Sequence, residues 1–184
     1  VTHSADRSIY IYLYAGGKYG TFSTNRLDMN EIEGFIENAV KMVQMLGEDE
    51  FRRLPDRDRM ADDAITGQEL GLYDNSYESI DTDTRLNKAQ SLSIFGKVQA
   101  DGYTLISEEA EYTDSYDDTF VVDSQGFEGR HTETTFSAFA EMTIEDSEGN
   151  KYSGFWWENT PFMEKLSESE VANKALDNAV RQIG

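Results

Sequence analysis

The stretch T-E-T-T-F-S-A-F-A-E-M-T-I-E, residues 132–145, decides the fold. Its apolar side chains recur at every second position, a spacing that places them on one face of an extended strand. This face carries Phe136, Ala138, Ala140, Met142 and Ile144. The alternate positions are mostly polar and carry Ser137, Glu141, Thr143 and Glu145. The pattern predicts a β-strand with one apolar face.

Further strands are predicted on both sides of this one. In residues 103–112 and 119–122 the sequence pattern also has a period of two, which predicts two strands. D-S-Q-G at 123–126 supplies the turn residues that lead into the central strand. D-S-E-G-N at 146–150 predicts a hairpin turn, and the strand that follows it spans residues 151–157.

A separate hairpin is predicted near the start of the chain. S-I-Y-I-Y-L-Y at 8–14 alternates aliphatic residues with tyrosines, Gly16-Gly17 marks a turn, and residues 18–24 form the return strand. One face of the first strand carries Ile9, Ile11 and Leu13, and the other carries Tyr10, Tyr12 and Tyr14.

Three helices are predicted. The first begins after Asp28, with Glu31 completing a capping-box-like pair, and Gly47 is its expected end. Its apolar stripe, which predicts packing against a sheet, contains Ile32, Phe35, Ile36, Ala39, Val40, Val43 and Leu46. A second helix is predicted over residues 81–100. It carries Leu86, Ala89, Leu92, Phe95 and Val98.

The third helix begins at Ser167, with Glu170 at the capping-box position, and runs to Gly184. Its apolar residues recur every four positions at Val171, Ala175, Ala179 and Ile183. Residues 48–79 are polar and form a long connection, with room for a helical turn. Together these elements predict one α+β domain over residues 1–184, a two-layer fold with a largely antiparallel β-sheet packed against two or three α-helices.

The composition is strongly acidic. Among 184 residues, 36 acidic and 16 basic residues give a net charge of −20, which argues against direct binding of nucleic acid. Such a surface favours basic peptides, a basic partner or divalent cations, although solubility alone also explains it. There is no cysteine, so disulfides and thiolate metal sites are excluded.

No apolar run reaches the roughly 20 residues that span a bilayer, and no signal peptide precedes the first strand. We therefore expect a cytoplasmic protein with no membrane contact. The first residues, V-T-H-S-A-D, lack an initiator methionine, so we expect the sequence to begin inside a longer protein or after processing.

Few residues suit catalysis or metal binding. Zinc needs about three convergent ligands, yet the only histidines in the chain are His3 and His131. His131 and Glu133 share one strand face, but they would supply only two ligands. The acidic groups at 81–83 and 114–118 lack the spacing of a calcium loop. No G-x-S-x-G elbow is present, and G-G-K-Y-G at 16–20 opens no helix. We therefore predict no catalytic, cofactor-binding or metal-binding residue in this chain.

For two aromatic groups we expect burial against helices, with contact with a partner or a peptide as the alternative. They are the tyrosines on one face of the first strand and F-W-W at 155–157.

Three stretches resemble the TldD/PmbA (TldE) family of bacterial peptidases. The first contains G-T-F-S-T-N-R-L-D at 20–28, then Ala39-Val40 and Leu54-Pro55. The second is V-V-D-S-Q-G-F-E-G at 121–129, and the third is A-E-M-T-I-E-D-S-E-G-N-K-Y-S-G-F-W-W at 140–157. The final helix, with Ala172, Ala175 and Ala179, is also similar. The D-G-Y at 101–103 departs from an Asp-x-Arg-Ile pattern found in many relatives.

The resemblance implies the N-terminal domain of such a protein, closer to the PmbA/TldE type. In the family, active members are zinc metallopeptidases whose HExxxH motif lies in a following domain, and a PmbA/TldE partner lacks the zinc ligands. They process peptides, including antibiotic precursors and antitoxins, and an older family label is modulator of DNA gyrase. The implied role of this chain is to build the substrate chamber and to contact the second domain, a partner subunit or a second copy. The alternative is a free-standing acidic α+β binding module with no link to proteolysis.

Overall fold

The computed structural model describes residues 2–98 and 101–183. The chain forms two compact units, Val1–Met60 and Ala61–Gly184, each with a sheet of its own. The two sheets and three helices confirm the predicted α+β class with antiparallel strands packed against helices. The sequence suggested one domain and did not indicate this division. The assignment of residues 1–184 to a single N-terminal domain stays a prediction.

The first unit is the predicted hairpin with its helix. Strands β1 (Ile9–Ala15) and β2 (Lys18–Thr24) pair antiparallel around Gly16 and Gly17, whose positive φ angles of 59° and 72° suit a tight turn. Helix α1 (Met29–Gln44) buries Ala39 and Val43, which are residues of the predicted stripe.

Both ends of α1 differ in detail from the prediction. Asp28 caps the helix as expected, because its carboxylate accepts a hydrogen bond of 3.0 Å from the backbone of Asn30. Glu31 instead lies 3.8 Å from the guanidinium of Arg26. The helix ends at Gln44 rather than near Gly47, because the chain tightens into hydrogen bonds that run back three residues from Met45.

The second unit contains a three-stranded antiparallel sheet in the order β3-β4-β5. Its strands are β3 (Tyr103–Val122), β4 (Glu128–Asp146) and β5 (Lys151–Thr160). The prediction of two strands at 103–112 and 119–122 is wrong, since β3 is continuous. The acidic residues between them hid the pattern, but the backbone ladder to β4 is unbroken there, for example where Asp117 faces Glu133.

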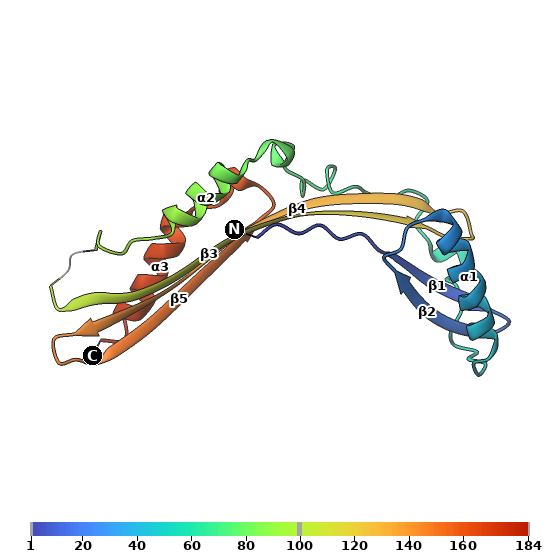
Figure 1. Cartoon of the computed structure of the whole chain (residues 1–184), viewed down its shortest axis with the longest axis horizontal. Coiled ribbons are helices and arrows are strands. Elements are labelled where there is room, and N and C mark those ends of the chain that lie inside the picture. The colour runs from blue at the N-terminus through green and yellow to red at the C-terminus, as the bar shows by residue number, and fades with distance from the viewer. Residues whose placement is uncertain (1, 99–100, 184) are drawn as a thin grey trace. The chain divides into compact units, whose positions relative to one another are not determined.

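Two helices cover one face of this sheet, as Figure 1 shows. Helix α3 (Glu168–Val180) packs on β4 and β5, and α2 (Thr82–Ser91) lies over β3. The predicted apolar face of β4 is entirely buried, with an exposed fraction of 0% for Phe136, Ala138, Ala140, Met142 and Ile144. The central prediction from the sequence is therefore confirmed.

Helix α2 is shorter than the predicted span of 81–100. It ends at Ser91, and Leu92 is fully buried. The carboxylate of Glu108 on β3 accepts backbone hydrogen bonds from Ile94 at 3.0 Å and Phe95 at 2.8 Å, which holds the chain in a non-helical turn. Residues 99–100 of the predicted helix lie outside the described residues.

Helix α3 also differs at its ends. Ser167 is its N-cap, but the Ser167 side chain makes no capping hydrogen bond to the helix backbone, and Glu170 pairs with Lys174 at 2.8 Å instead of closing a capping box. The helix ends at Val180, and Gly184 lies outside the described residues. The long connection contains two short 3-10 turns, Arg57–Arg59 and Tyr77–Ser79, in agreement with the helical turn that the sequence allowed.

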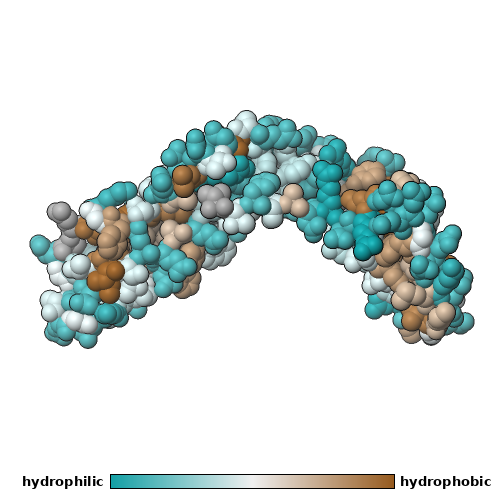
Figure 2. Space-filling model, viewed as in Figure 1, coloured by the Kyte–Doolittle hydropathy of each residue, from teal (hydrophilic) through white to brown (hydrophobic). Residues whose placement is uncertain are grey.

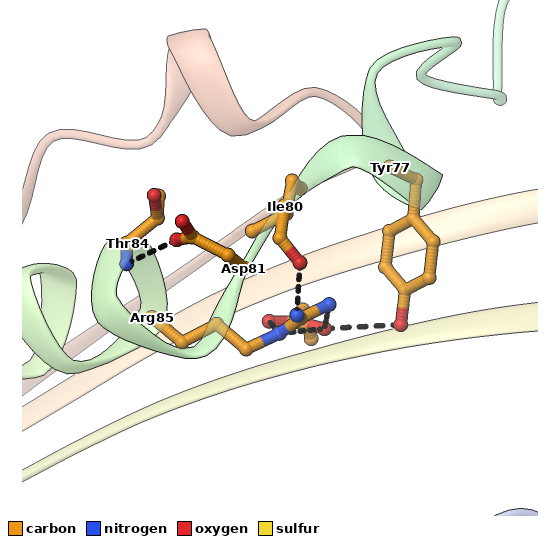
Figure 3. A network of polar contacts seen from close by, with 6 residues as sticks. Tyr77, Ile80, Asp81, Thr84 and Arg85 are labelled. Carbon is orange, nitrogen blue, oxygen red and sulfur yellow. Dashed lines mark hydrogen bonds and ion pairs between the residues drawn. The ribbon is translucent and has the colours of Figure 1, made fainter.

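A polar network joins α2 to β3 (Figure 3). Arg85 extends from α2 and donates three hydrogen bonds to Asp114: two from Nε, of 2.8 Å and 3.1 Å, and one of 3.0 Å from Nη2. Arg85 also donates to the backbone carbonyl of Ile80, and Tyr77 donates its hydroxyl to Asp114 at 3.0 Å. The Asp114 side chain is only 5% exposed, so the network satisfies a carboxylate that would otherwise be buried unpaired.

The close contact of α3 with β5 gives a stability prediction. A Cβ on Gly154 would lie 2.2 Å from the backbone nitrogen of Ala179 and 2.5 Å from the carbonyl oxygen of Ala175. Because the helix backbone must shift to make room, Gly154→Ala should lower the free energy of unfolding by about 1–3 kcal/mol or more in urea denaturation. Gly34→Ala is the control, because nothing lies within 4 Å and a helical alanine should be neutral or stabilising. Equal effects of the two variants would contradict the packing described here.

The network around Asp114 gives a second prediction. Arg85→Met leaves a buried carboxylate without its cation and should cost about 3 kcal/mol in urea denaturation. Arg130→Met is a matched control, because Arg130 and Asp118 form a similar 2.8 Å pair with exposed fractions of 62% and 34%, so its loss should cost much less than the loss of Arg85. If Arg85→Met lowers the free energy of unfolding no more than Arg130→Met does, the buried carboxylate of Asp114 does not need Arg85 as its cation.

Candidate functional site: a groove between β5 and α3

A groove lies where β5, an outer strand of its sheet, meets α3. It has a volume of about 500 Å³, and its lining residues are Ser153, Gly154, Phe155, Trp156, Trp157, Asn178 and Gln182. A second hollow of about 200 Å³ shares Trp156 and Asn178 with the first and adds Lys174, Asp177 and Arg181. We call the two hollows together the edge groove. Figure 2 shows hydrophobic side chains on the surface of this unit.

Side chains of α3 protect part of the free edge of β5. Asn178 donates to the carbonyl of Phe155 at 3.1 Å, and Gln182 donates to that of Ser153 at 2.6 Å. In an antiparallel strand, alternate residues point their backbone groups the same way, so Trp157 and Asn159 also direct theirs to the free edge. Among the described residues, no side chain caps those two carbonyls. An extended segment could therefore add to this end of β5.

An ion network fixes the aromatic wall of the groove. Lys174 lies 2.8 Å from both Glu158 and Glu170, and its ammonium group is 5.0 Å from the centre of the Trp156 ring. The hydrogen bond from Lys174 lowers the pKa of Glu158, and those from Glu158 and Glu170 raise the pKa of Lys174. Glu158 and Lys174 are therefore charged at neutral pH, and the ammonium group of Lys174 holds the Trp156 ring from one side.

The chemistry of this groove suits binding. It offers indole and phenyl surfaces beside amide donors and a short length of free strand edge, which are the features of sites for extended peptides. Its described residues include no nucleophile next to a base. Within residues 2–98 and 101–183, no group of three or more His, Cys, Asp or Glu side chains is placed to hold a metal ion.

The histidines do not form a metal site in the described part of the chain. His131 and Glu133 do come together, with 3.3 Å between Nε2 and Oε2, as their shared strand face predicted. A third ligand is missing there among the described residues, and His3 is exposed in the segment before β1. The donor set therefore does not fit a catalytic zinc.

The acidic groups have structural partners. Asp81 caps α2 by accepting a hydrogen bond of 2.7 Å from the backbone of Thr84. Hydrogen bonding from the Thr84 side chain, together with this backbone bond, lowers the pKa of Asp81. In the second group, Asp114 binds Arg85 and Asp118 binds Arg130. Burial, with a contribution from Asp114, raises the pKa of Tyr112, whose hydroxyl has no hydrogen-bond partner among the described residues. These groups stabilise turns and layers and form no calcium loop.

The G-G-K-Y-G stretch at 16–20 forms the turn and the start of the return strand of a hairpin, which gives no phosphate site.

The two aromatic groups have different environments. Tyr10 and Tyr12 are 70% and 65% exposed in the first unit, whereas Tyr14 packs on Tyr19 with 4.8 Å between ring centres. Of F-W-W, all three residues line the edge groove.

Sequence reasoning missed Lys174, Asn178 and Gln182. They occur every four residues on α3, a spacing that indicates one polar helix face. That signal could have marked a shared face, but only the packing of α3 on β5 shows that the face borders an aromatic strand. No helix among the described residues is long and apolar enough to cross a membrane.

The chain is similar to known proteins over most of its length. Residues 75–183 match the sequence model of the PmbA/TldA metallopeptidase central domain. A solved structure from Bacteroides thetaiotaomicron, named as a modulator of DNA gyrase, has a TM-score of 0.86 and 30% identity over 98% of this chain and 40% of its own. A second, from Thermotoga maritima and named in the same way, has a TM-score of 0.70 and 20% identity over 94% of this chain and 37% of its own, and it supports the fold. No curated protein matches the chain.

This chain therefore spans about two fifths of the length of those solved structures. The matching model is that of a central domain, whereas the sequence motifs suggested the N-terminal one. The match includes the sheet, α2, α3 and the edge groove between β5 and α3. The chain belongs to the TldD/PmbA metallopeptidase family.

Proposed function

We propose that this chain is a non-catalytic part of a TldD/PmbA-type zinc metallopeptidase system that processes peptides. Its role is to form part of the wall of the chamber that admits peptides and to contact the second domain of its protein, a partner subunit or a second copy. The observation that carries this proposal is the edge groove, which offers aromatic side chains and a free piece of strand edge inside the segment that matches the family.

Several features support a binding role. The pairing of His131 with Glu133 is too small a ligand set for zinc, so any catalytic zinc would be held by residues outside this chain. The Ser-Gln-Gly turn after β3 and the hairpin between β4 and β5 favour the PmbA/TldE type over the TldD type. A cytoplasmic location, where short peptides are degraded, fits this role.

The proposal predicts the outcome of a reconstitution. The protein should cleave no unstructured peptide by itself, with or without added zinc, and should support cleavage when it is co-expressed with an HExxxH-bearing family member of the same organism. Trp156→Ala should lower that cleavage several-fold, because it removes the aromatic wall of the edge groove. Phe95→Ala should leave it unchanged, since this exposed side chain lies after α2 and away from the groove.

Two results would contradict the proposal. One is zinc-dependent cleavage by this protein alone that His131→Ala abolishes. The other is a protein that neither associates with the zinc-bearing member nor alters its activity, which would favour the free-standing acidic binding module.

A further inference from the structure

The sheet of the second unit has a second face, opposite α2 and α3. Since the even-numbered residues of β4 from Thr134 to Ile144 are buried, the odd-numbered residues between them point the other way. The strand register places odd-numbered residues of β3 and β5 beside them. Six of these residues form what we call the acidic–aromatic face: Glu109, Glu111, Phe139, Glu141, Phe155 and Trp157.

The carboxylates of this face have no counter-ions in the described part of the chain. Glu109 lies directly opposite Glu141, and Glu111 lies one row further along, opposite Phe139. Like charges that face each other across two strands are unfavourable. The nearest base on this face is Lys151, at the hairpin end of the sheet, where it pairs with Glu145 at 3.7 Å. The face therefore presents an uncompensated negative field.

Aromatic rings lie beside these carboxylates across the strands: Phe155 is opposite Glu141. Phe139 and Phe155 have 6.4 Å between ring centres, and Trp157 lies opposite Phe139. Phe155 and Trp157 are 58% and 57% exposed. The face of an aromatic ring attracts a cation, and the attraction is strongest for tryptophan. Carboxylates and rings thus favour the same ligand, a positively charged group that carries an apolar stem.

We propose that the acidic–aromatic face binds an extended cationic peptide segment, with lysine or arginine at alternate positions. Side chains two residues apart on a strand repeat every 6.6 Å or so, and the alternate side chains of an extended peptide repeat at the same distance. Carboxylates two residues apart on β3, such as those of Glu109 and Glu111, can therefore bind successive cationic side chains of one peptide. That the ligand is a peptide rests on the proposed function. The positive charge of the peptide and the alternate spacing of its cations go beyond the proposed function.

Charge also argues against other ligands at the acidic–aromatic face. A second copy of the chain carries the same net charge of −20, and nucleic acid and anionic membranes are negative as well. A cationic segment is attracted by the negative charge of the whole molecule and is then held at the acidic–aromatic face, where rings and unpaired carboxylates coincide. Binding should weaken with added salt, because exposed charges are screened.

Intrinsic fluorescence can test this directly, because the chain has only two tryptophans. In Trp156→Phe the remaining indole, Trp157, reports on the acidic–aromatic face. Titration of this variant with the peptide (Lys-Thr)5 should change its fluorescence with a measurable Kd, and (Gln-Thr)5 should bind at least tenfold more weakly. Replacing Glu109, Glu111 and Glu141 together by glutamine should weaken binding of (Lys-Thr)5 at least tenfold.

A second triple variant is the matched control. Replacing Glu33, Glu37 and Glu50 by glutamine removes the same charge from exposed positions of the first unit and should change the Kd by less than twofold. Circular dichroism checks that each variant is folded. Equal weakening by both triple variants, equal binding of (Gln-Thr)5, or calorimetric binding without a response of Trp157 would each overturn the proposal. Binding of a folded basic protein in place of the peptide would also overturn it. These titrations measure no cleavage, so their failure leaves the reconstitution result intact.

Discussion

The contact between Gly154 of β5 and the backbone of α3 is the constraint on which the second unit depends. A glycine in the strand and alanines at 175 and 179 in the helix allow the two backbones to approach closely. This approach buries the apolar face of β4, because α3 can then lie flat across it. It also sets the width of the edge groove, since the same helix turns bring Asn178 and Gln182 to the edge of β5.

Polar contacts hold α2, the other helix that covers this sheet, against β3. Arg85 and Glu108 each join the α2 region to β3, one through a buried carboxylate and the other through backbone N–H groups. Such contacts add little net stability compared with apolar packing of the same volume. They do specify where α2 lies and where it ends, because a misplaced helix would leave a buried charge without a partner.

One sheet therefore carries two different chemistries. The even-numbered residues of β4 from Phe136 to Ile144 form an apolar core under the helices, and the odd-numbered residues beside them lie on a face with carboxylates and exposed rings. The edge groove lies at the border between these faces, along β5, an outer strand that pairs only with β4. A binding role for this unit needs no group beyond these side chains and the free edge of β5.

The sequence by itself determined the strand at 132–145, the first hairpin, the cap at Asp28 and the kinship of the chain, because these depend on local periodicity and motif order. Tertiary structure decided the rest. The acidic stretch of β3 is a strand because β4 pairs with it, and α2 stops where Glu108 captures the following turn. The edge groove joins residues far apart in the sequence, such as Phe155 and Asn178, which are 23 positions apart. The acidic–aromatic face joins residues of three strands. No local pattern encodes which side chains meet when strands take their register and a helix docks on them.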